Sequence, residues 1–154
     1  MNHPSVKAVF ISIILLVFGI ALYVLSQNSH FSSYNKDQIY IGNKYFSVYI
    51  ANTEDKRQLG LGNLRDIDKN QAMLFVFDGP DTYHFWMKDM NFNIDLVCID
   101  MAKEVNKIYE NLDPELFPEV YECPFPTKYA LELKAGEISD TKIKIGDSIR
   151  IENM

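Results

Sequence analysis

The sequence MLFVF at residues 73–77 is a continuous apolar run, which is typical of a buried β-strand. Turn-forming residues follow at 78–81 (DGPD), and a second strand is predicted at residues 83–88 (YHFWMK). Short runs with strand patterning continue on both sides of this pair. They are residues 38–41, 44–50, 94–100, 104–110, 129–133, 142–145 and 148–151. Gly42-Asn43, between the first two runs, is a turn-forming pair that predicts a hairpin. A chain of about eight short strands with few helices predicts a mostly β domain, either a sandwich or a distorted barrel.

Two short helices and one irregular segment interrupt this strand pattern. Thr53 can cap a short helix that has acidic residues in its first turn and can end at Gly60. A second short helix is predicted at residues 137–141. Four prolines gather between residues 111 and 127, and this density predicts a long irregular excursion rather than a strand.

The N-terminal segment has a different character. Residues 8–25 (AVFISIILLVFGIALYVL) are 18 residues without a charge, which is close to the length that crosses a bilayer as a helix. Lys7 precedes this run, so residues 1–25 are predicted to be a single-pass signal anchor with a cytoplasmic N-terminus. The alternative is a cleaved signal peptide. Either way, a polar tether at residues 26–37 would lead to an extracytoplasmic domain at residues 38–154, so the membrane is a predicted partner.

The charge of the chain excludes one class of partner. The 154 residues carry a net charge of −6 with a pI near 5.0, whereas a nucleic-acid-binding protein normally presents a basic face. The first 37 residues hold only two basic side chains and one acidic one, so the remaining 13 basic and 20 acidic side chains give the domain −7. The common catalytic and nucleotide-binding motifs are absent from the sequence, which therefore predicts no cofactor and no metal site.

The second predicted strand contains the most suggestive side chains. Strand alternation places Phe85 and Met87 on one face and sends the side chains of His84, Trp86 and Lys88 to the other. If Phe85 and Met87 are buried, the chain's one tryptophan lies on the more polar face, where it could form the wall of a ligand site. The alternative is that another element covers Trp86 and makes it part of the core.

Two carboxylates lie inside apolar runs and therefore need partners. Asp95 follows Ile94 in the strand at 94–100, and Arg57 is a suitable ion-pair partner. Glu132 lies within the run ALEL. Asp95 and Glu132, with His84 as a further group, could perform acid–base chemistry or hold a divalent cation in an envelope enzyme. The alternative is that each carboxylate anchors a loop by accepting backbone N–H groups.

The two cysteines can form a bridge if the domain is exported. Cys98 shares strand parity with Ile94 and Leu96, and Cys123 lies in the proline-rich excursion. A Cys98–Cys123 disulfide is chemically permitted outside the cytoplasm, and two free thiols are the alternative.

Several of these segments, in this order, resemble the family called domain of unknown function 192, a group of small exported or membrane-anchored prokaryotic proteins. The matching segments are 56–61 (KRQLGL), 72–77 (AMLFVF), 85–88 (FWMK), 94–95 (ID), 129–132 (YALE), 135–136 (AG) and 145–147 (IGD). The chain departs from the family pattern at Asp89-Met90, where the family has Asn-Thr, and at Asn93, where it has proline. After Gly60-Leu61, Gly62 and Leu64 occupy the places of the family's methionine and arginine, and Arg65 comes one position late. The resemblance implies a jelly-roll-like β sandwich and no established activity.

These observations favour a tethered, non-catalytic binding module for a small ligand, an envelope component or a protein. Trp86 and Lys88 would form its contact surface, while Arg57, Asp95 and Glu132 would hold the surrounding loops. The carboxylate enzyme is one alternative. A structural subunit of a membrane complex is another, and an exposed apolar patch would favour it.

Overall fold

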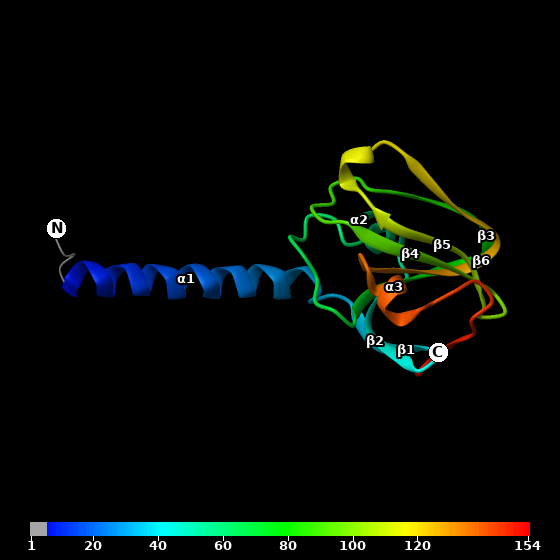
Figure 1. Cartoon of the computed structure of the whole chain (residues 1–154), viewed down its shortest axis with the longest axis horizontal. Helices are drawn as coiled ribbons and strands as arrows, with labels where there is room; N and C mark the ends of the chain where they lie inside the picture. The colour runs from blue at the N-terminus through cyan, green and yellow to red at the C-terminus, as the bar shows by residue number, and fades with distance from the viewer. Residues whose placement is uncertain (1–5) are drawn as a thin grey trace. The chain divides into compact units, whose positions relative to one another are not determined.

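The computed structural model describes residues 6–154, without the side chains of Val6, Ala8 and residues 23–29. The chain divides after Ser33, and the second unit comprises Tyr34–Met154. The first unit contains helix α1, Val6–His30 (Figure 1). Within the described part of the chain, no helix combines the length and the apolar character that crossing a membrane requires. The anchor at residues 1–25, of which residues 1–5 lie outside the description, stays a prediction.

The second unit is built around one mixed sheet. In chain order its elements are β1 (Asn35–Ile41), β2 (Lys44–Ala51), α2 (Glu54–Leu59), β3 (Gln71–Trp86), β4 (Ile94–Asp100), β5 (Val105–Leu112), the 3₁₀ helix η1 (Pro114–Leu116), β6 (Val120–Lys134), α3 (Glu137–Thr141) and β7 (Ile149–Ile151). The seven strands have the order β5-β4-β6-β3-β2-β1-β7, and only the β2–β3 pair is parallel. The predicted β class is confirmed. Of the two predicted architectures, the sandwich is wrong, because all seven strands of the described domain belong to one sheet. The distorted barrel is the alternative nearer to the curled sheet that is observed.

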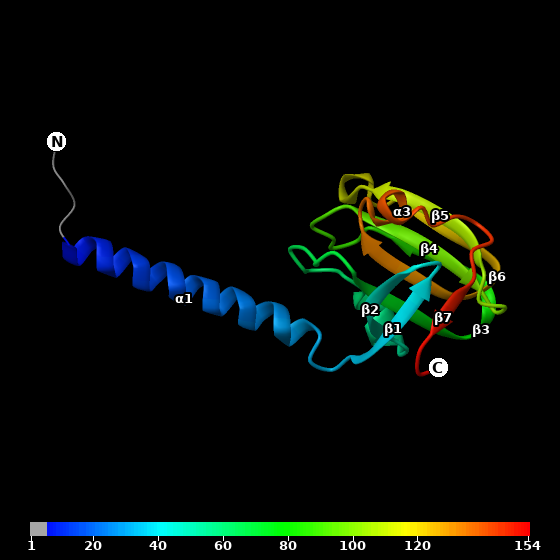
Figure 2. The same ribbon diagram turned by 60° about the horizontal axis from the view of Figure 1, so that its bottom comes forward.

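The sheet curls until its two edges meet at one end, which gives a half-barrel. Glu104, just before β5, forms an antiparallel bridge with Ser148, just before β7. The Val105 N–H donates to the Asp147 carbonyl at 2.9 Å, and the Ile149 N–H donates to the Lys103 carbonyl at 2.8 Å. Figure 2 shows β7 lying along β1, with the chain from α3 reaching it across the open side of the curl.

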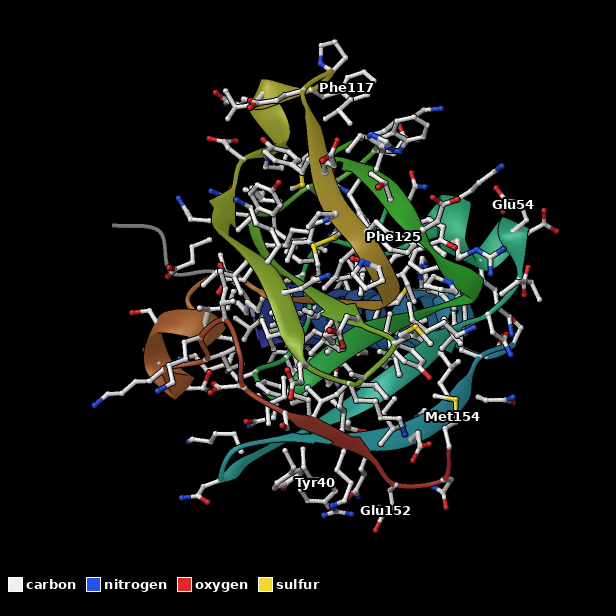
Figure 3. All side chains as sticks on the ribbon, turned by 90° about the vertical axis from the view of Figure 1, so that its right-hand side faces the viewer. Tyr40, Glu54, Phe117, Phe125, Glu152 and Met154 are labelled. Atoms are coloured by element: carbon white, nitrogen blue, oxygen red, sulfur yellow. A yellow bond between two sulfur atoms is a disulfide. The ribbon has the colours of Figure 1, made fainter. Side chains whose placement is uncertain are left out.

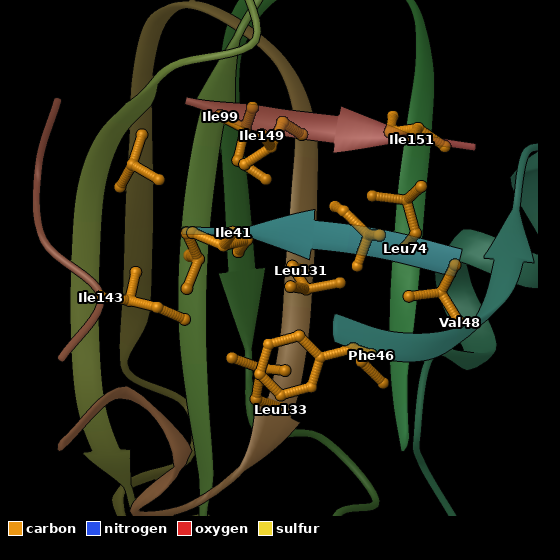
Figure 4. Close-up of a cluster of buried hydrophobic side chains, with 14 of the residues drawn as sticks. Ile41, Phe46, Val48, Leu74, Ile99, Leu131, Leu133, Ile143, Ile149 and Ile151 are labelled. Atoms are coloured by element: carbon orange, nitrogen blue, oxygen red, sulfur yellow. The ribbon is translucent and has the colours of Figure 1, made fainter. Parts of the chain in front are cut away.

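The concave side of this curl encloses the main hydrophobic core (Figure 4). Phe46 and Val48 from β2 face Leu131 and Leu133 from β6 across this space, and all four are fully buried. Strand alternation gives the core one side chain in two from each strand. The intervening residue of β6, Glu132, therefore lies on the outer face of the sheet.

The two long strands differ from the sequence prediction. β3 continues through the predicted turn at 78–81, with an irregular register between Val76 and Asp81. The Lys128 ammonium accounts for part of this, because it binds the carbonyls of Phe77 and Asp78 at 2.5 and 2.8 Å. Residues that read locally as a turn are thus held in a bulged strand.

The proline-rich excursion is also shorter than predicted. β6 begins at Val120 and contains Pro124 and Pro126. The buried Thr127 hydroxyl donates to the Pro124 carbonyl at 2.6 Å, which stabilises the irregular stretch where both prolines lie. The strand predicted at residues 142–145 is absent from the described structure, because Lys144 N–H binds the Asp147 carboxylate in a turn.

The local signals near the chain's turns and caps are confirmed. Thr53 Oγ1 accepts a hydrogen bond from Lys56 N at 3.4 Å at the start of α2, and Gly60 ends this helix. The β1–β2 hairpin turns at Gly42, which has a φ of +57°. Cys98 on β4 and Cys123 on β6 form the predicted disulfide, with their Cα atoms 5.4 Å apart.

Candidate functional site

A cleft of about 620 Å³ opens on the outer side of the sheet. It lies between α2, the chain that follows α2, and the second half of β3. Figure 3 shows Glu54, the first residue of α2, beside this part of β3, while Phe117 marks the far end of the segment that leads into β6. The cleft is lined by aromatic side chains, by the backbone around Gly60 and by Glu132.

Glu132 is the buried carboxyl group in the lining of the cleft. Its side chain is 6% exposed, and its register partners on the neighbouring strands are the apolar Met73 and Leu96. The Leu61 N–H donates a hydrogen bond to the carboxyl group. The Oε2 atom has no hydrogen-bond partner among the described residues. A polar atom buried in this way is costly unless something binds it.

The pKa of Glu132 reflects this environment. Burial raises it from 4.5 to about 8, and the hydrogen bond from the Leu61 N–H opposes the shift. The carboxyl group is therefore mainly protonated at neutral pH. In this form it is both a hydrogen-bond donor and an acceptor.

Gly60 brings the backbone close to this carboxyl group. Its φ of +51° and ψ of −138° lie in a region that side-chain-bearing residues rarely adopt. A Cβ at this position would lie 3.4 Å from Glu132 Oε2 and 3.4 Å from Phe75 Cζ. The glycine thus permits the chain after α2 to pack closely over Glu132 and Phe75.

Aromatic rings form the wall of the cleft. Phe77 stacks on Tyr83 with a centroid separation of 3.5 Å, and Phe85 meets Phe75 edge to face at 5.2 Å. The Tyr83 hydroxyl donates to the Gly79 carbonyl at 2.7 Å, so the bulge in β3 helps to orient this ring. Trp86 also lines the cleft, and it is 53% exposed.

Arg57 supports this wall and does not contact Asp95. Its guanidinium group donates to the Val76 carbonyl at 3.0 Å, pairs with Glu54 at 3.2 Å and lies 5.6 Å from the centroid of the Phe77 ring. The predicted Arg57–Asp95 ion pair is therefore wrong. Arg57 instead anchors α2 to the bulged part of β3.

Asp95 anchors neighbouring segments by accepting backbone N–H groups, which was the alternative to a catalytic role. It is fully buried and accepts hydrogen bonds from the backbone N–H groups of Asn111 at 2.8 Å and Ile138 at 2.9 Å. Asp95 pairs in register with Leu133, whereas Glu132 pairs with Leu96, so the two carboxylates point to opposite faces of the sheet. The predicted carboxylate pair does not converge.

The remaining predicted residues do lie at the cleft. His84, Trp86 and Lys88 all line it, and His84 Nε2 lies 3.6 Å from the Glu122 carboxylate. The interpretation of Trp86 as a core residue is wrong, because half of its side chain is exposed. Across residues 6–154, no three His, Cys, Asp or Glu side chains gather in a way that could hold a metal ion.

Sequence reasoning missed the other aromatic residues of the cleft. Phe75 and Phe77 were assigned to a buried run, and Tyr83 received no role. The available signal was strand alternation, because Leu74 faces the main core while Phe75 and Phe77 face the other side.

The family model DUF192, described as an uncharacterized ACR, matches residues 38–151. The chain is a member of the DUF192 family. The resemblance drawn from the sequence motifs is confirmed. The motif segments at 56–61, 72–77, 85–88 and 129–132 all supply residues to the cleft of this DUF192 domain.

Two solved structures share this DUF192 fold. One is a protein of Sinorhizobium meliloti 1021 whose description proposes a transcription regulator, with a TM-score of 0.75 and 24% identity over 79% of this chain and 98% of that chain. The other is a protein of unknown function from Novosphingobium aromaticivorans, with a TM-score of 0.70 and 23% identity over 73% and 83% of the two chains. A comparison with curated proteins gives no match.

Proposed function

We propose that this DUF192 domain is a non-catalytic binding module that takes a small ligand into the cleft between α2 and β3. The observation that carries the proposal is the Oε2 atom of Glu132, which is buried in the cleft without a hydrogen-bond partner among the described residues. A bound ligand could supply the missing partner and offset the cost of burying this group.

The shape and lining of the cleft support a small ligand. Its volume of about 620 Å³ is within the range of small-molecule sites, and its lining combines aromatic rings with charged side chains. The carboxylate enzyme receives less support, because Asp95 and Glu132 lie on opposite faces of the sheet. Acid–base catalysis by a pair needs both groups within reach of one substrate.

The single tryptophan gives a direct test, because it lies in the cleft. The full chain would be titrated with a panel of sugars, amino acids, carboxylates and quaternary amines, while NMR follows the Trp86 indole N–H and the amides of Gly60 and Leu61. At least one compound class should shift all three signals in a saturable way. Shifts confined to residues outside the cleft, or no shifts with any class, would refute the proposal.

Two variants separate binding from folding. Trp86→Ala should abolish the response of the Gly60 and Leu61 amides, with little change in the midpoint of thermal unfolding. Tyr45→Ala is the matched control, because Tyr45 is 55% exposed on β2 and does not line the cleft. A large loss of stability in Trp86→Ala alone would show that Trp86 acts mainly in packing.

We also propose that the N-terminal segment tethers the domain to the outer side of the cell membrane. The uncharged run at residues 8–25 and the Cys98–Cys123 disulfide support this placement, because stable disulfides are typical of compartments outside the cytoplasm. A C-terminal epitope on the full chain should be found in the membrane fraction and be removed by protease added to intact spheroplasts. A protected epitope in the soluble cytoplasmic fraction would contradict the proposal.

A further inference from the structure

We infer that the ligand of this cleft carries a substituted ammonium group, which pairs with the Glu132 carboxylate and packs against the aromatic wall. This inference rests on the proposed binding function and names the chemical class of the ligand. Four features of the described residues support it: the carboxyl oxygen without a partner, the glycine beside it, the aromatic wall and the charges of the cleft lining.

The Glu132 carboxyl group has one oxygen left to bind a cation, and its orientation is fixed by the protein. The Leu61 N–H holds the carboxyl group from one side, while Oε2 is left without a partner among the described residues. Gly60 has no side chain beside this oxygen, where a Cβ would lie 3.4 Å away. A carboxylate in an apolar surrounding needs a cation or several donors to be stable. An ammonium group bound in the cleft that Glu132 lines would supply this charge.

The wall of the cleft suits the apolar surface of a substituted ammonium group. Such cations bind the faces of aromatic rings, and tryptophan binds them best. In the described domain no ring stacks on Trp86, which is 53% exposed at the cleft. The wall already holds one cation of the protein, because the Arg57 guanidinium lies 5.6 Å from the centroid of the Phe77 ring.

The charges around the cleft favour a cation over an anion. Besides Glu132, the lining contains three acidic side chains, Glu54, Asp78 and Asp89, and two basic ones, Arg57 and Lys88. Arg57 is already paired with Glu54. The lining therefore has a net charge of −1 when Glu132 is protonated and −2 when it is ionised, so it repels anions and attracts cations.

Binding a cation must release a proton. Below pH 8 the free cleft holds Glu132 as a neutral acid, and the pair with the ligand requires the carboxylate, so the proton leaves to solvent as the cation enters. Burial, and then the charge of Glu132, raises the pKa of the nearby Tyr34. The other titratable or charged side chains of the cleft are those of Glu54, Arg57, Asp78, Tyr83, His84, Lys88 and Asp89. Affinity for a permanently charged ligand should therefore rise with pH and level off above about pH 8.

Choline and 3,3-dimethyl-1-butanol test this inference, because they have nearly the same shape and differ by one positive charge. Each would be titrated into the full chain at pH 6, 7.5 and 9, with NMR detection at the Trp86 indole N–H. A pKa of about 8 makes Glu132 about 1% ionised at pH 6 and about 90% ionised at pH 9. Choline should accordingly bind about 90-fold more tightly at pH 9, and the neutral alcohol should show no such increase.

Two further measurements support or overturn the role of Glu132. Glu132→Gln keeps the shape and removes the charge, so it should remove the pH dependence of choline binding, whereas Glu110→Gln, at an exposed site on β5, should not. Calorimetry of the unaltered chain in buffers of different ionisation enthalpy should show about 0.9 proton released per choline at pH 7. This readout needs no variant and is independent of whether Glu132→Gln folds.

The outcomes distinguish this inference from the proposed function. If the alcohol binds as tightly as choline, or if choline affinity does not change with pH, the cleft binds ligands but the ammonium assignment is wrong. If another compound class from the broader panel shifts the cleft signals and choline does not, the assignment is again wrong. If no compound shifts the Trp86, Gly60 and Leu61 signals, the binding function itself fails.

Discussion

Replacing Glu132 with glutamine should make the domain less sensitive to alkaline pH. In the folded chain burial raises the pKa of Glu132 from 4.5 to about 8, so the folded state holds this proton more tightly than the unfolded state does. The stabilisation linked to the proton is complete below about pH 4.5 and is lost as the pH rises to 8. Glutamine resembles the protonated acid in shape and does not titrate, so the variant has no such loss.

The size of the effect follows from the shift. Linkage gives a loss of about 1.4 kcal/mol in the free energy of unfolding for each pH unit between pH 4.5 and pH 8. The sum over this window is about 5 kcal/mol, which is comparable with the whole stability of a small domain. The wild-type chain should therefore lose stability relative to Glu132→Gln steadily across this range and no further above it.

Urea unfolding followed by circular dichroism measures this difference. Both chains would be compared at each pH from 5 to 9, so that the contributions of the other titrating groups cancel. Glu110→Gln changes an exposed glutamate on β5 and should follow the wild-type profile. A constant difference between wild type and Glu132→Gln across the whole range would refute the assignment of Glu132 as a buried, mainly neutral acid.

Three other changes test further parts of the structure. Replacing Cys98 and Cys123 together with alanine should lower the free energy of unfolding by about 3 kcal/mol, because the bridge joins residues 25 apart. Unfolding the wild-type chain with and without a reductant should give a similar loss, and equal midpoints would contradict it. Gly60→Ala should cost about 1–3 kcal/mol and weaken binding in the cleft, since the backbone conformation is strained for alanine and its Cβ would lie 3.4 Å from the free carboxyl oxygen; an unchanged urea midpoint would count against this. Asp95→Asn should cost about 1–3 kcal/mol, because the amide NH₂ cannot accept from one of the two backbone N–H groups. Faster hydrogen exchange at those two amides is expected, and unchanged exchange would show that Asp95 is not their anchor.

Local chemistry made part of the fold predictable. The cap at Thr53 and the turn at Gly42 depend on neighbouring residues, and both form as predicted. The continuous strands β3 and β6 depend on distant partners. Lys128 binds the carbonyls at the β3 bulge, and no short stretch of sequence shows that these groups will meet. The turn-forming residues 78–81 therefore predicted that the strand ends there, whereas contacts with distant residues keep β3 continuous.

The candidate site was predictable in composition and not in arrangement. Of the six candidate residues, Arg57, His84, Trp86, Lys88 and Glu132 line the cleft, and Asp95 does not. Alternation within one strand correctly predicts that Trp86 is exposed, but it assigns Phe85 to the other face, and both residues line the cleft. The separation of Asp95 from Glu132 depends on the register between β4 and β6, which only the pairing of the two strands reveals.

Within the described domain, the edges of the half-barrel are poor templates for aggregation. An open sheet edge presents unpaired N–H and C=O groups to which another chain can add a strand. Here one edge strand, β7, is only three residues long, and the start of the other, β5, already pairs with the chain that leads into β7. At this end of the half-barrel a neighbouring copy of the protein would find little backbone to extend, so edge-to-edge assembly should be disfavoured there even when many copies are crowded together.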